Sequence, residues 1–338
     1  MTPRGAAIGV IGAGSWGTTL ADMLAKKGHD VTLWAYEAEL VTEMTQHRTN
    51  SLFLPGIALS PRLRFTGSLE EAVAAKELLL FVVPSQVTRG VITAVRHLIS
   101  TDAVIVSASK GIELDTLKTV SQLYEELLPE ELYRRFAVLS GPSFAREVAQ
   151  EMPTAVVAAA LDSAIAGRVQ QVFTTPFFRV YTNNDIIGVE LGGAIKNVIA
   201  IAAGVSDGLG LGYNTRAALI TRGLAEMSRL GLALGAQAST FAGLAGMGDL
   251  VLTCTGDLSR NRSVGIKLGQ GMKLKEIMAE MRMVAEGVKT TESAWQLACR
   301  QGVDMPITEQ VYRMLYEDKP ARTAVIELMT RDLKAEGV

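Results

Sequence analysis

The stretch Gly12-Ala13-Gly14-Ser15-Trp16-Gly17 decides how the N-terminal half of this chain is interpreted. It follows a short β-branched run over residues 8–11 and precedes a segment over residues 18–27 whose apolar side chains fall on one helical face. In such a strand–turn–helix unit the first glycine makes the tight turn, the second admits a pyrophosphate, and the third lets helix and strand pack. The free N–H groups and the dipole at the helix start favour the anion. The sequence therefore predicts a dinucleotide site, with a purely structural glycine turn as the alternative in a chain that has 32 glycines.

The glycine motif opens a series of apolar strands. Gly28 is suited to ending the first helix, and residues 31–34 supply a second strand that completes a unit of about 30 residues. Further runs at 78–83, 104–107 and 137–139 are apolar throughout, which is typical of parallel strands covered on both faces. We therefore expect a parallel α/β sheet.

Glycine and polar residues follow three of these strands, at Pro84-Ser85, Ser109-Lys110-Gly111 and Gly141-Pro142-Ser143. The carboxyl ends of the strands are where an open α/β sheet keeps its ligands. We therefore expect these three segments to lie in one crevice with the glycine loop.

The pattern changes after residue 184 to long helical segments. These lie at 188–205, 215–234, 273–283 and 290–300. A chain of 338 residues also exceeds the usual size of one domain. We predict an α/β fold in which a Rossmann-type dinucleotide-binding domain over residues 1–184 is followed by an all-α substrate-binding domain over residues 185–338.

The composition excludes several classes of protein. Lys and Arg number 33 against 35 Asp and Glu, so a net charge of -2 gives no long-range attraction to nucleic acid or to an anionic membrane. No run approaches the roughly 20 uninterrupted apolar residues of a membrane helix. The N-terminus also lacks the apolar region and cleavage site of a signal peptide. These features predict a cytoplasmic protein without an integral membrane segment.

The histidines and cysteines form no metal-binding pattern, so we expect no metal site. His29, His47 and His97 lack metal-ligand spacing and are expected at the surface, which argues against a zinc enzyme and against a histidine base. Cys254 and Cys299 are expected to be reduced thiols.

The residues after the second strand bear on the choice of cofactor. The position that ends this strand selects between a ribose hydroxyl and a 2′-phosphate, and here it is Ala35. Ala35 lacks the carboxylate that would repel a phosphate, whereas Tyr36-Glu37 offers no arginine to bind one. We therefore expect both NADH and NADPH to be used. Tyr36 is either a stacking partner of the adenine or a simple surface residue.

Lys196 is the candidate for proton transfer. It lies in a segment over residues 189–200 that is apolar on nearly all sides and is therefore expected to be buried. Desolvation lowers the pKa of a lysine, which enables the amine to exchange a proton near neutral pH. Gly192 and Gly193, one turn earlier, would let a ligand approach the helix backbone. The alternative is a lysine whose stem reaches the surface.

Two further segments carry candidate ligand-binding side chains. Lys110 follows a strand and could orient a carbonyl or hydroxyl oxygen, or it could be an exposed loop residue. In the second half, glycines and small polar residues interrupt the helical pattern between Gly246 and Arg262. There the cluster Ser259-Arg260-Asn261 could hold a phosphate through side-chain donors and a helix N-terminus. Alternatively, Ser259 only caps the next helix and Arg260 is solvated.

Six motifs together resemble those of the bacterial NAD(P)-dependent glycerol-3-phosphate dehydrogenases, in order and over nearly the whole chain. They are Gly12-Ala13-Gly14-Ser15-Trp16-Gly17-Thr18, Ser109-Lys110-Gly111, Ser140-Gly141-Pro142-Ser143-Phe144-Ala145, Leu191-Gly192-Gly193-Ala194-Ile195-Lys196-Asn197, Gly248-Asp249-Leu250-Val251-Leu252-Thr253-Cys254 and Ser259-Arg260-Asn261. The resemblance implies hydride transfer between NAD(P)(H) and the pair dihydroxyacetone phosphate and sn-glycerol 3-phosphate. It also implies a supply of glycerol 3-phosphate to phospholipid biosynthesis and a homodimer.

The resemblance also implies roles for single residues, beginning with Lys196 as the proton acceptor in glycerol phosphate oxidation. The implied substrate contacts are Lys110, Gly141, Ser143, Asp249, Ser259, Arg260 and Asn261, with Asn197 and Thr253 as supporting positions. The implied cofactor contacts are Ser15, Trp16, Lys110, Ala145, Arg260, Val284 and Glu286, beside Gly12, Gly14, Gly17 and Tyr36. Many members carry one or two arginines where this chain has Tyr36-Glu37, which counts against a strong preference for NADPH.

Two other functions remain open at the level of the sequence. One is another two-domain reductase, acting on a 3-hydroxy acid or on ketopantoate, which would not need Ser259-Arg260-Asn261 as a phosphate site. The other is a catalytically silent NAD(H)-sensing module, against which Lys110 and Lys196 argue.

Overall fold

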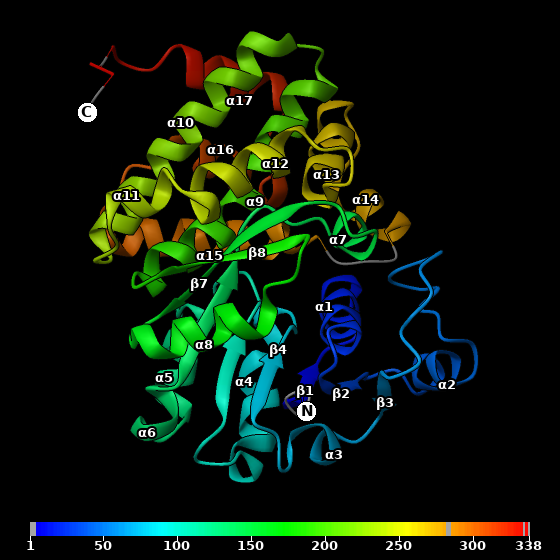
Figure 1. Cartoon of the computed structure of the whole chain (residues 1–338). Coiled ribbons are helices and arrows are strands. Elements are labelled where there is room, and N and C mark those ends of the chain that lie inside the picture. Colours follow the sequence, from blue (N-terminus) through cyan, green and yellow to red (C-terminus); the bar gives the residue numbers. More distant parts are fainter. Residues whose placement is uncertain (1–4, 282–284, 334, 337–338) are drawn as a thin grey trace.

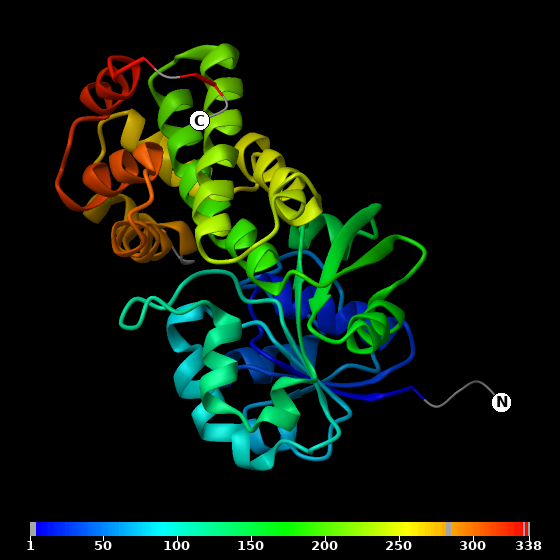
Figure 2. The same cartoon turned by 90° about the vertical axis from the view of Figure 1, so that its left-hand side faces the viewer.

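The computed structural model describes residues 5–281, 285–333 and 335–336. A twisted sheet with helices on its faces forms one half of the molecule and a layer of packed helices forms the other (Figure 1). Figure 2, turned by 90°, shows that the long helix α9 (Ile186–Gly208) lies where the two halves meet. The α/β fold with a following helical half is as predicted.

The sheet of the described residues has eight strands in the order β3-β2-β1-β4-β5-β6-β7-β8. All neighbours are parallel except β6 and β7, which are antiparallel. The strands are β1 (Ala7–Ile11), β2 (Asp30–Trp34), β3 (Arg64–Thr66), β4 (Leu78–Phe81), β5 (Val104–Ser107), β6 (Phe136–Ser140), β7 (Thr154–Ala160) and β8 (Phe178–Asn183).

Helices surround this sheet and build the second half. Those in the sheet-bearing half are α1 (Ser15–Lys26), α2 (Ala38–His47), α3 (Leu69–Val73), α4 (Ser85–Val95), the 3₁₀ helix η1 (Arg96–Leu98), α5 (Val120–Leu127), α6 (Glu130–Tyr133), α7 (Ala145–Ala149) and α8 (Ser163–Phe173). After α9 follow α10 (Gly212–Ala233), α11 (Ala238–Phe241), the π-helix η2 (Leu244–Gly248), α12 (Asp249–Thr255), α13 (Arg260–Gly269), α14 (Leu274–Glu280), α15 (Glu286–Gln301), α16 (Pro306–Tyr316) and α17 (Ala321–Met329).

The apolar runs identified in the sequence form the centre of the sheet. Ile8 of β1 pairs with Val31 on one side and Leu78 on the other, and all three side chains are buried. The sequence did not predict β3, β7 and β8. The strand β7 reads Thr-Ala-Val-Val-Ala-Ala-Ala, and alanine is depleted in strands, so the local propensity gives little sign of it.

The helical segments are also largely as expected, with two differences. The interruption expected between Gly246 and Arg262 is present in two places, at the π-helix η2 and at the turn over residues 256–259, and the regular helix α12 lies between them. The segment expected at 273–283 forms α14 only as far as Glu280, and its last two residues lie outside the described part of the chain.

The helix α9 is interior to the protein. The carboxylate of Asp185 caps its N-terminus by accepting a hydrogen bond from Gly188 N at 2.9 Å. By length and composition this is the one helix among the described residues that could cross a membrane, and 94% of the qualifying window is buried inside the protein. Its apolar surface is therefore explained by packing. Gly204 on α9 and Gly265 on α13 allow this packing, because a Cβ on Gly204 would lie 2.1 Å from Arg262 O.

The cysteines are free thiols, as expected, with Cys254 buried and Cys299 exposed. The histidines differ from expectation at one position. His47 and His97 are exposed, but His29 is half-buried because its Nδ1 accepts a hydrogen bond from Ala6 N at 3.1 Å.

Candidate active site

The glycine loop has the backbone geometry that its sequence predicts. Gly12 has a φ of 114°, and Gly17 packs so closely that a Cβ there would lie 1.9 Å from Gly12 O. A Cβ on Gly14 would have no atom within 4 Å, so the space beside Gly14 is open. Among the described residues no side-chain hydrogen bond caps the N-terminus of α1 at Gly14. The loop thus presents free N–H groups to an open space, which fits a pyrophosphate.

A residue that sequence reasoning missed supports this loop from below. The buried Asn50 donates from Nδ2 to Ala13 O at 2.9 Å and to Thr18 Oγ1 at 2.9 Å, and Thr18 Oγ1 in turn donates to Ala13 O at 3.1 Å. Asn50 is 37 residues from Ala13 in the sequence, so no local pattern indicates this contact.

Three other predicted cofactor residues of the sheet-bearing half lie next to the glycine loop. Ser15 and Trp16 begin α1, and the Trp16 ring lies 6.3 Å from that of Phe178. Ala145, at the start of α7, is adjacent because Thr19 of α1 donates to Ala145 O at 3.2 Å.

Two residues after β2 are arranged differently from one another. Ala35 is fully buried, whereas the side chain of Tyr36 is 84% exposed and meets the ring of Trp34 edge-on at 6.4 Å. Tyr36 therefore lies at the surface, where it could stack on an adenine or be a simple surface residue.

Lys196 is buried in α9, with 7% of the residue exposed. Its Nζ donates to Asp249 Oδ1 at 2.6 Å and to Thr253 Oγ1 at 2.8 Å. Asp249 and Thr253 are one turn apart on α12, so both face the same lysine. The alternative of a stem that reaches the surface is wrong, because the partners of the ammonium are themselves buried.

Lys110, in the loop after β5, joins the same carboxylate from the other side. Its Nζ lies 2.6 Å from Asp249 Oδ2 and donates to Gly141 O at 3.4 Å. Ser143 Oγ also donates to Gly141 O, at 3.2 Å. We call Lys110, Lys196, Asp249 and Thr253 the two-lysine centre. The segments after β5 and β6 thus lie side by side, as their positions at strand ends predict, and Lys110 also contacts α12 of the helical half.

Burial and charge together set the protonation of the centre. Burial lowers the pKa of Lys196 to about 8, with Lys110 acting in the same direction and Asp249 opposing it. Burial acts to raise the pKa of Asp249, but Lys110 and Lys196 outweigh it and hold that pKa below its ordinary value. The centre therefore holds a carboxylate and an amine that can exchange a proton near neutral pH.

Gly192 and Gly193 serve a different purpose from the one predicted. A Cβ on Gly192 would lie 2.4 Å from Ala245 O, and one on Gly193 would lie 2.9 Å from Ser140 Oγ and 3.5 Å from the Lys110 side chain. Protein atoms therefore occupy the space expected for a ligand. Gly193 instead lets the Lys110 stem approach α9.

The cluster Ser259-Arg260-Asn261 begins α13. Ser259 Oγ accepts from Arg262 N at 3.2 Å, so Ser259 caps α13, as the alternative to a phosphate contact requires. Asn261 Oδ1 accepts from Gly287 N at 2.9 Å, which fixes α13 to the start of α15. Arg260 is exposed.

The start of α15 brings the cluster toward the two-lysine centre. Burial raises the pKa of Glu286, an effect that the charges of Arg260, Lys110 and Lys196 oppose. Glu286 therefore lies close enough to each of these three cations for their charges to act on it. Asn197 is buried beside Lys196 in α9, and its backbone oxygen lies 2.9 Å from the Cβ position of Gly287. Val284, a predicted cofactor contact, lies outside the described residues.

Comparison with known proteins agrees with the family resemblance of the motifs. A family model for the N-terminus of NAD-dependent glycerol-3-phosphate dehydrogenase matches residues 7–166, and one for its C-terminus matches residues 185–326. The chain is 72% identical over 329 residues to the glycerol-3-phosphate dehydrogenase [NAD(P)+] of Geobacter sulfurreducens, covering 97% of this chain and 98% of the relative. The corresponding enzyme of Maridesulfovibrio salexigens is 60% identical, with coverage of 97% and 99%.

Solved structures give the same result. The crystal structure of glycerol-3-phosphate dehydrogenase from Coxiella burnetii superimposes with a TM-score of 0.92 at 42% identity, covering 97% of this chain and 100% of that one. A ketopantoate reductase from Ralstonia eutropha shares only the fold, with a TM-score of 0.57 at 16% identity and coverage of 95% and 99%. The chain therefore belongs to the NAD-dependent glycerol-3-phosphate dehydrogenase family.

Proposed function

We propose that this chain interconverts dihydroxyacetone phosphate and sn-glycerol 3-phosphate with NADH or NADPH, and that Lys196 transfers the proton. The observation that carries the proposal is the two-lysine centre, in which a buried amine with a pKa of about 8 shares one carboxylate with Lys110. Family membership supports the substrate and the cofactor.

The chemistry divides between the cofactor and the side chains. A bound nicotinamide ring supplies or receives the hydride at the carbon that carries the oxygen. In reduction Lys196 Nζ gives a proton to that oxygen, and in oxidation the neutral amine takes it back. Thr253 and Asp249 hold the amine in place. Lys110, held by the other oxygen of Asp249, stabilises the negative charge that develops on the substrate oxygen.

The phosphate of the substrate is assigned to the start of α13. Arg260 is exposed, and its planar guanidinium suits a two-pronged contact with a phosphate. Ser259 and Asn261 already use one oxygen each within the protein, so they orient the helix start as well as contribute to the site. The N-terminus of α13 adds backbone donors. Asn197, Gly141 and Ser143 complete the proposed substrate contacts.

The cofactor is assigned to the glycine loop. The open space beside Gly14 and the uncapped start of α1 suit a pyrophosphate. Ser15, Trp16 and Ala145 lie at this end, and Lys110, Arg260 and Glu286 would meet the nicotinamide half. Tyr36 is exposed after β2, where it supplies no positive charge for a 2′-phosphate. We therefore propose that NADH and NADPH are both used.

The proposal also covers the oligomeric state, the cellular location, the metabolic role and the domain boundary. A homodimer in the cytoplasm that supplies phospholipid biosynthesis follows from the family resemblance, and light scattering tests the dimer. We also propose a domain boundary at residue 184. Its support is that β8 ends at Asn183 and α9 begins at Ile186.

A steady-state assay tests the function. The enzyme is expected to reduce dihydroxyacetone phosphate with either cofactor, followed at 340 nm, and to leave ketopantoate and unphosphorylated 3-keto acids unreduced. Reduction of ketopantoate alone would favour the runner-up reductase. Binding of dinucleotide without reduction of any ketone would favour a sensing module.

A further inference from the structure

Lys110 depends on a short hairpin that follows it. Ile112 and Thr119 pair as an antiparallel bridge, which defines the 112–119 hairpin between β5 and α5. Ile112 is fully buried and belongs to the apolar core of the helical half. The hairpin therefore contacts both halves of the molecule. Contacts that hold the hairpin in place also restrain the backbone of Lys110, two residues before Ile112.

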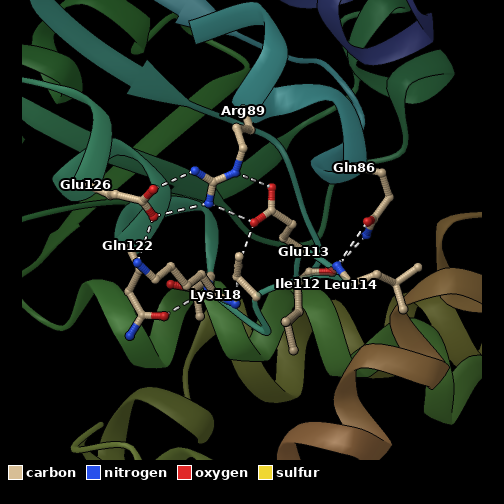
Figure 3. Close-up of polar contacts among 10 residues, drawn as sticks. Gln86, Arg89, Ile112, Glu113, Leu114, Lys118, Gln122 and Glu126 are labelled. Atoms are coloured by element: carbon tan, nitrogen blue, oxygen red, sulfur yellow. Dashed lines mark hydrogen bonds and ion pairs between the residues drawn. The ribbon is translucent and has the colours of Figure 1, made fainter. Parts of the chain in front are cut away.

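Gln86, the second residue of α4, clamps the beginning of this hairpin (Figure 3). Its Nε2 donates to Ile112 O at 2.8 Å, and its Oε1 accepts from Leu114 N at 3.1 Å. A single amide thus satisfies two backbone groups, as a neighbouring strand would.

Arg89 lies one turn later on the same face of α4 and holds the hairpin more firmly. Its Nε and Nη2 donate to Glu113 at 3.0 and 2.9 Å, and its Nη1 and Nη2 donate to Glu126 at 2.6 and 3.1 Å (Figure 3). Glu113 is buried, and Lys118 of the hairpin donates to Glu126 at 2.7 Å. Two-pronged pairs of this kind fix direction as well as distance.

The residue between Lys110 and the hairpin also rests on α4. Gly111 has a φ of 134°, and a Cβ there would lie 2.4 Å from Ser85 Oγ. The backbone from Lys110 to Leu114 is therefore held against α4 at three successive places.

We propose that Gln86 and Arg89 are positioning residues that hold the 112–119 hairpin on α4 and thereby keep Lys110 Nζ on Asp249 and Gly141 O. The proposal rests on the proposed function, because it acts through the contact of Lys110 with the two-lysine centre. A misplacement of about 1 Å at a reacting group can cost about 100-fold in rate, so a loosened hairpin has a measurable effect.

A double-mutant cycle tests this. The variant Gln86→Met removes both hydrogen bonds of the clamp, keeps the side-chain length and leaves no buried charge unpaired. We expect it to lower kcat/KM for dihydroxyacetone phosphate about tenfold or more in the otherwise unchanged enzyme, while adding less than about twofold in a Lys110→Met background, because coupled residues are not additive. The variant Arg89→Met is expected to behave in the same way.

The control is Arg134→Met, which breaks an exposed arginine–carboxylate pair with Glu130 on α6 and should leave kcat/KM unchanged. Melting temperatures of all variants are measured in parallel. If Arg89→Met does not fold, because Glu113 is left buried and unpaired, the Gln86 cycle decides alone.

Two results would overturn the proposal. One is a Gln86→Met enzyme within twofold of the parent, and the other is an equal loss with and without Lys110, which indicates a purely structural role. If the parent enzyme itself does not reduce dihydroxyacetone phosphate, the proposed function fails rather than the clamp.

Discussion

The glycine loop and the two-lysine centre are built in opposite ways. The loop consists of six consecutive residues, and its features are backbone features: a φ of 114° at Gly12, a close approach at Gly17 and an open space at Gly14. In the centre, Lys196 meets Asp249 across 53 positions of sequence and Lys110 meets it across 139. There the important groups are side-chain charges in a buried setting.

This difference separates the effects of substitutions. In the loop, an added methyl group acts by filling space, so affinity and stability respond to shape. In the centre, a side chain can be replaced at nearly constant volume, and the response comes from charge and proton transfer.

The largest expected effect is that of Lys196→Met on the centre. Methionine keeps the length and the apolar stem, and Asp249 keeps its ion pair with Lys110, so the protein should still fold, with some loss of stability from the broken pair with Lys196. Turnover is expected to fall by about 100-fold to 10,000-fold, because proton transfer by a positioned side chain is lost. Dinucleotide affinity should persist, since the glycine loop binds through its backbone. Titration of cofactor and turnover measured on one purified sample check this, and near-normal turnover would assign the proton to Lys110 instead.

Arg260→Ala tests whether the centre is separate from the phosphate site. We expect kcat/KM for dihydroxyacetone phosphate to fall by about 10-fold to 100-fold, as expected for loss of a hydrogen bond to a charged group. Unphosphorylated dihydroxyacetone should lose less, unless Arg260 also touches the cofactor. Unchanged KM and kcat in the variant would move the phosphate site elsewhere.

Two alanine substitutions in the glycine loop separate its binding role from its packing role. Gly14→Ala meets no protein atom within 4 Å, so the melting temperature should hold while dinucleotide affinity falls by about tenfold. Gly17→Ala places a Cβ 1.9 Å from Gly12 O. It should therefore destabilise the fold by about 1–3 kcal/mol, as overpacking does. Calorimetry gives the melting temperature of each variant. Equal melting temperatures for the two variants would contradict the different roles of Gly14 and Gly17.

The pH dependence tests the charges of the centre. Oxidation of glycerol 3-phosphate needs the neutral amine, so kcat/KM should rise with pH and level off above the Lys196 pKa of about 8. Asp249 raises that pKa, so Asp249→Asn should move the rising limb to lower pH. In the described part of the chain, the other titratable groups that interact with Lys196 are Lys110, Glu286 and Cys254, none of which is substituted in this variant. If the rising part of the kcat/KM profile stays at the same pH, or moves to higher pH, a group other than Lys196 controls it.

The smallest effect is expected where the adenosine ribose of the cofactor binds, after β2. The parent enzyme should not discriminate strongly between NADH and NADPH. Tyr36→Arg adds a charge at an exposed position, so preference should shift toward NADPH by about tenfold or less, given the weakness of exposed ion pairs. Ratios of kcat/KM for the two cofactors measure this. A several-hundredfold preference in the parent would refute the expectation.

The two regions also differ in how far the sequence predicts them. The loop could be predicted from a hexamer and its flanking periodicity, because local backbone geometry depends on local residues. Burial of Lys196 could be predicted from the apolar residues around it, but its ion pair with Asp249 could not, because the family resemblance implied Asp249 only as a substrate contact. Asn50 and the Gln86 clamp were missed, because each joins segments whose proximity exists only in the folded chain. Gly192 was misinterpreted for the same reason, since the Ala245 backbone that fills its space lies 53 residues away.

The interior position of α9 has a consequence during synthesis of the chain. This helix has 23 residues, about 35 Å at 1.5 Å per residue, which would span the roughly 30 Å hydrocarbon layer of a bilayer. The helix α10 follows directly and packs on α9, whereas α13 follows about 50 residues later, so at about 5–20 residues per second the face of α9 that α13 covers waits several seconds for its partner. Lys196 stands at the middle of that helix, where a lysine opposes membrane insertion by about 2.5–3.5 kcal/mol. A charge at the position proposed for proton transfer thus also disfavours insertion of this helix into a bilayer.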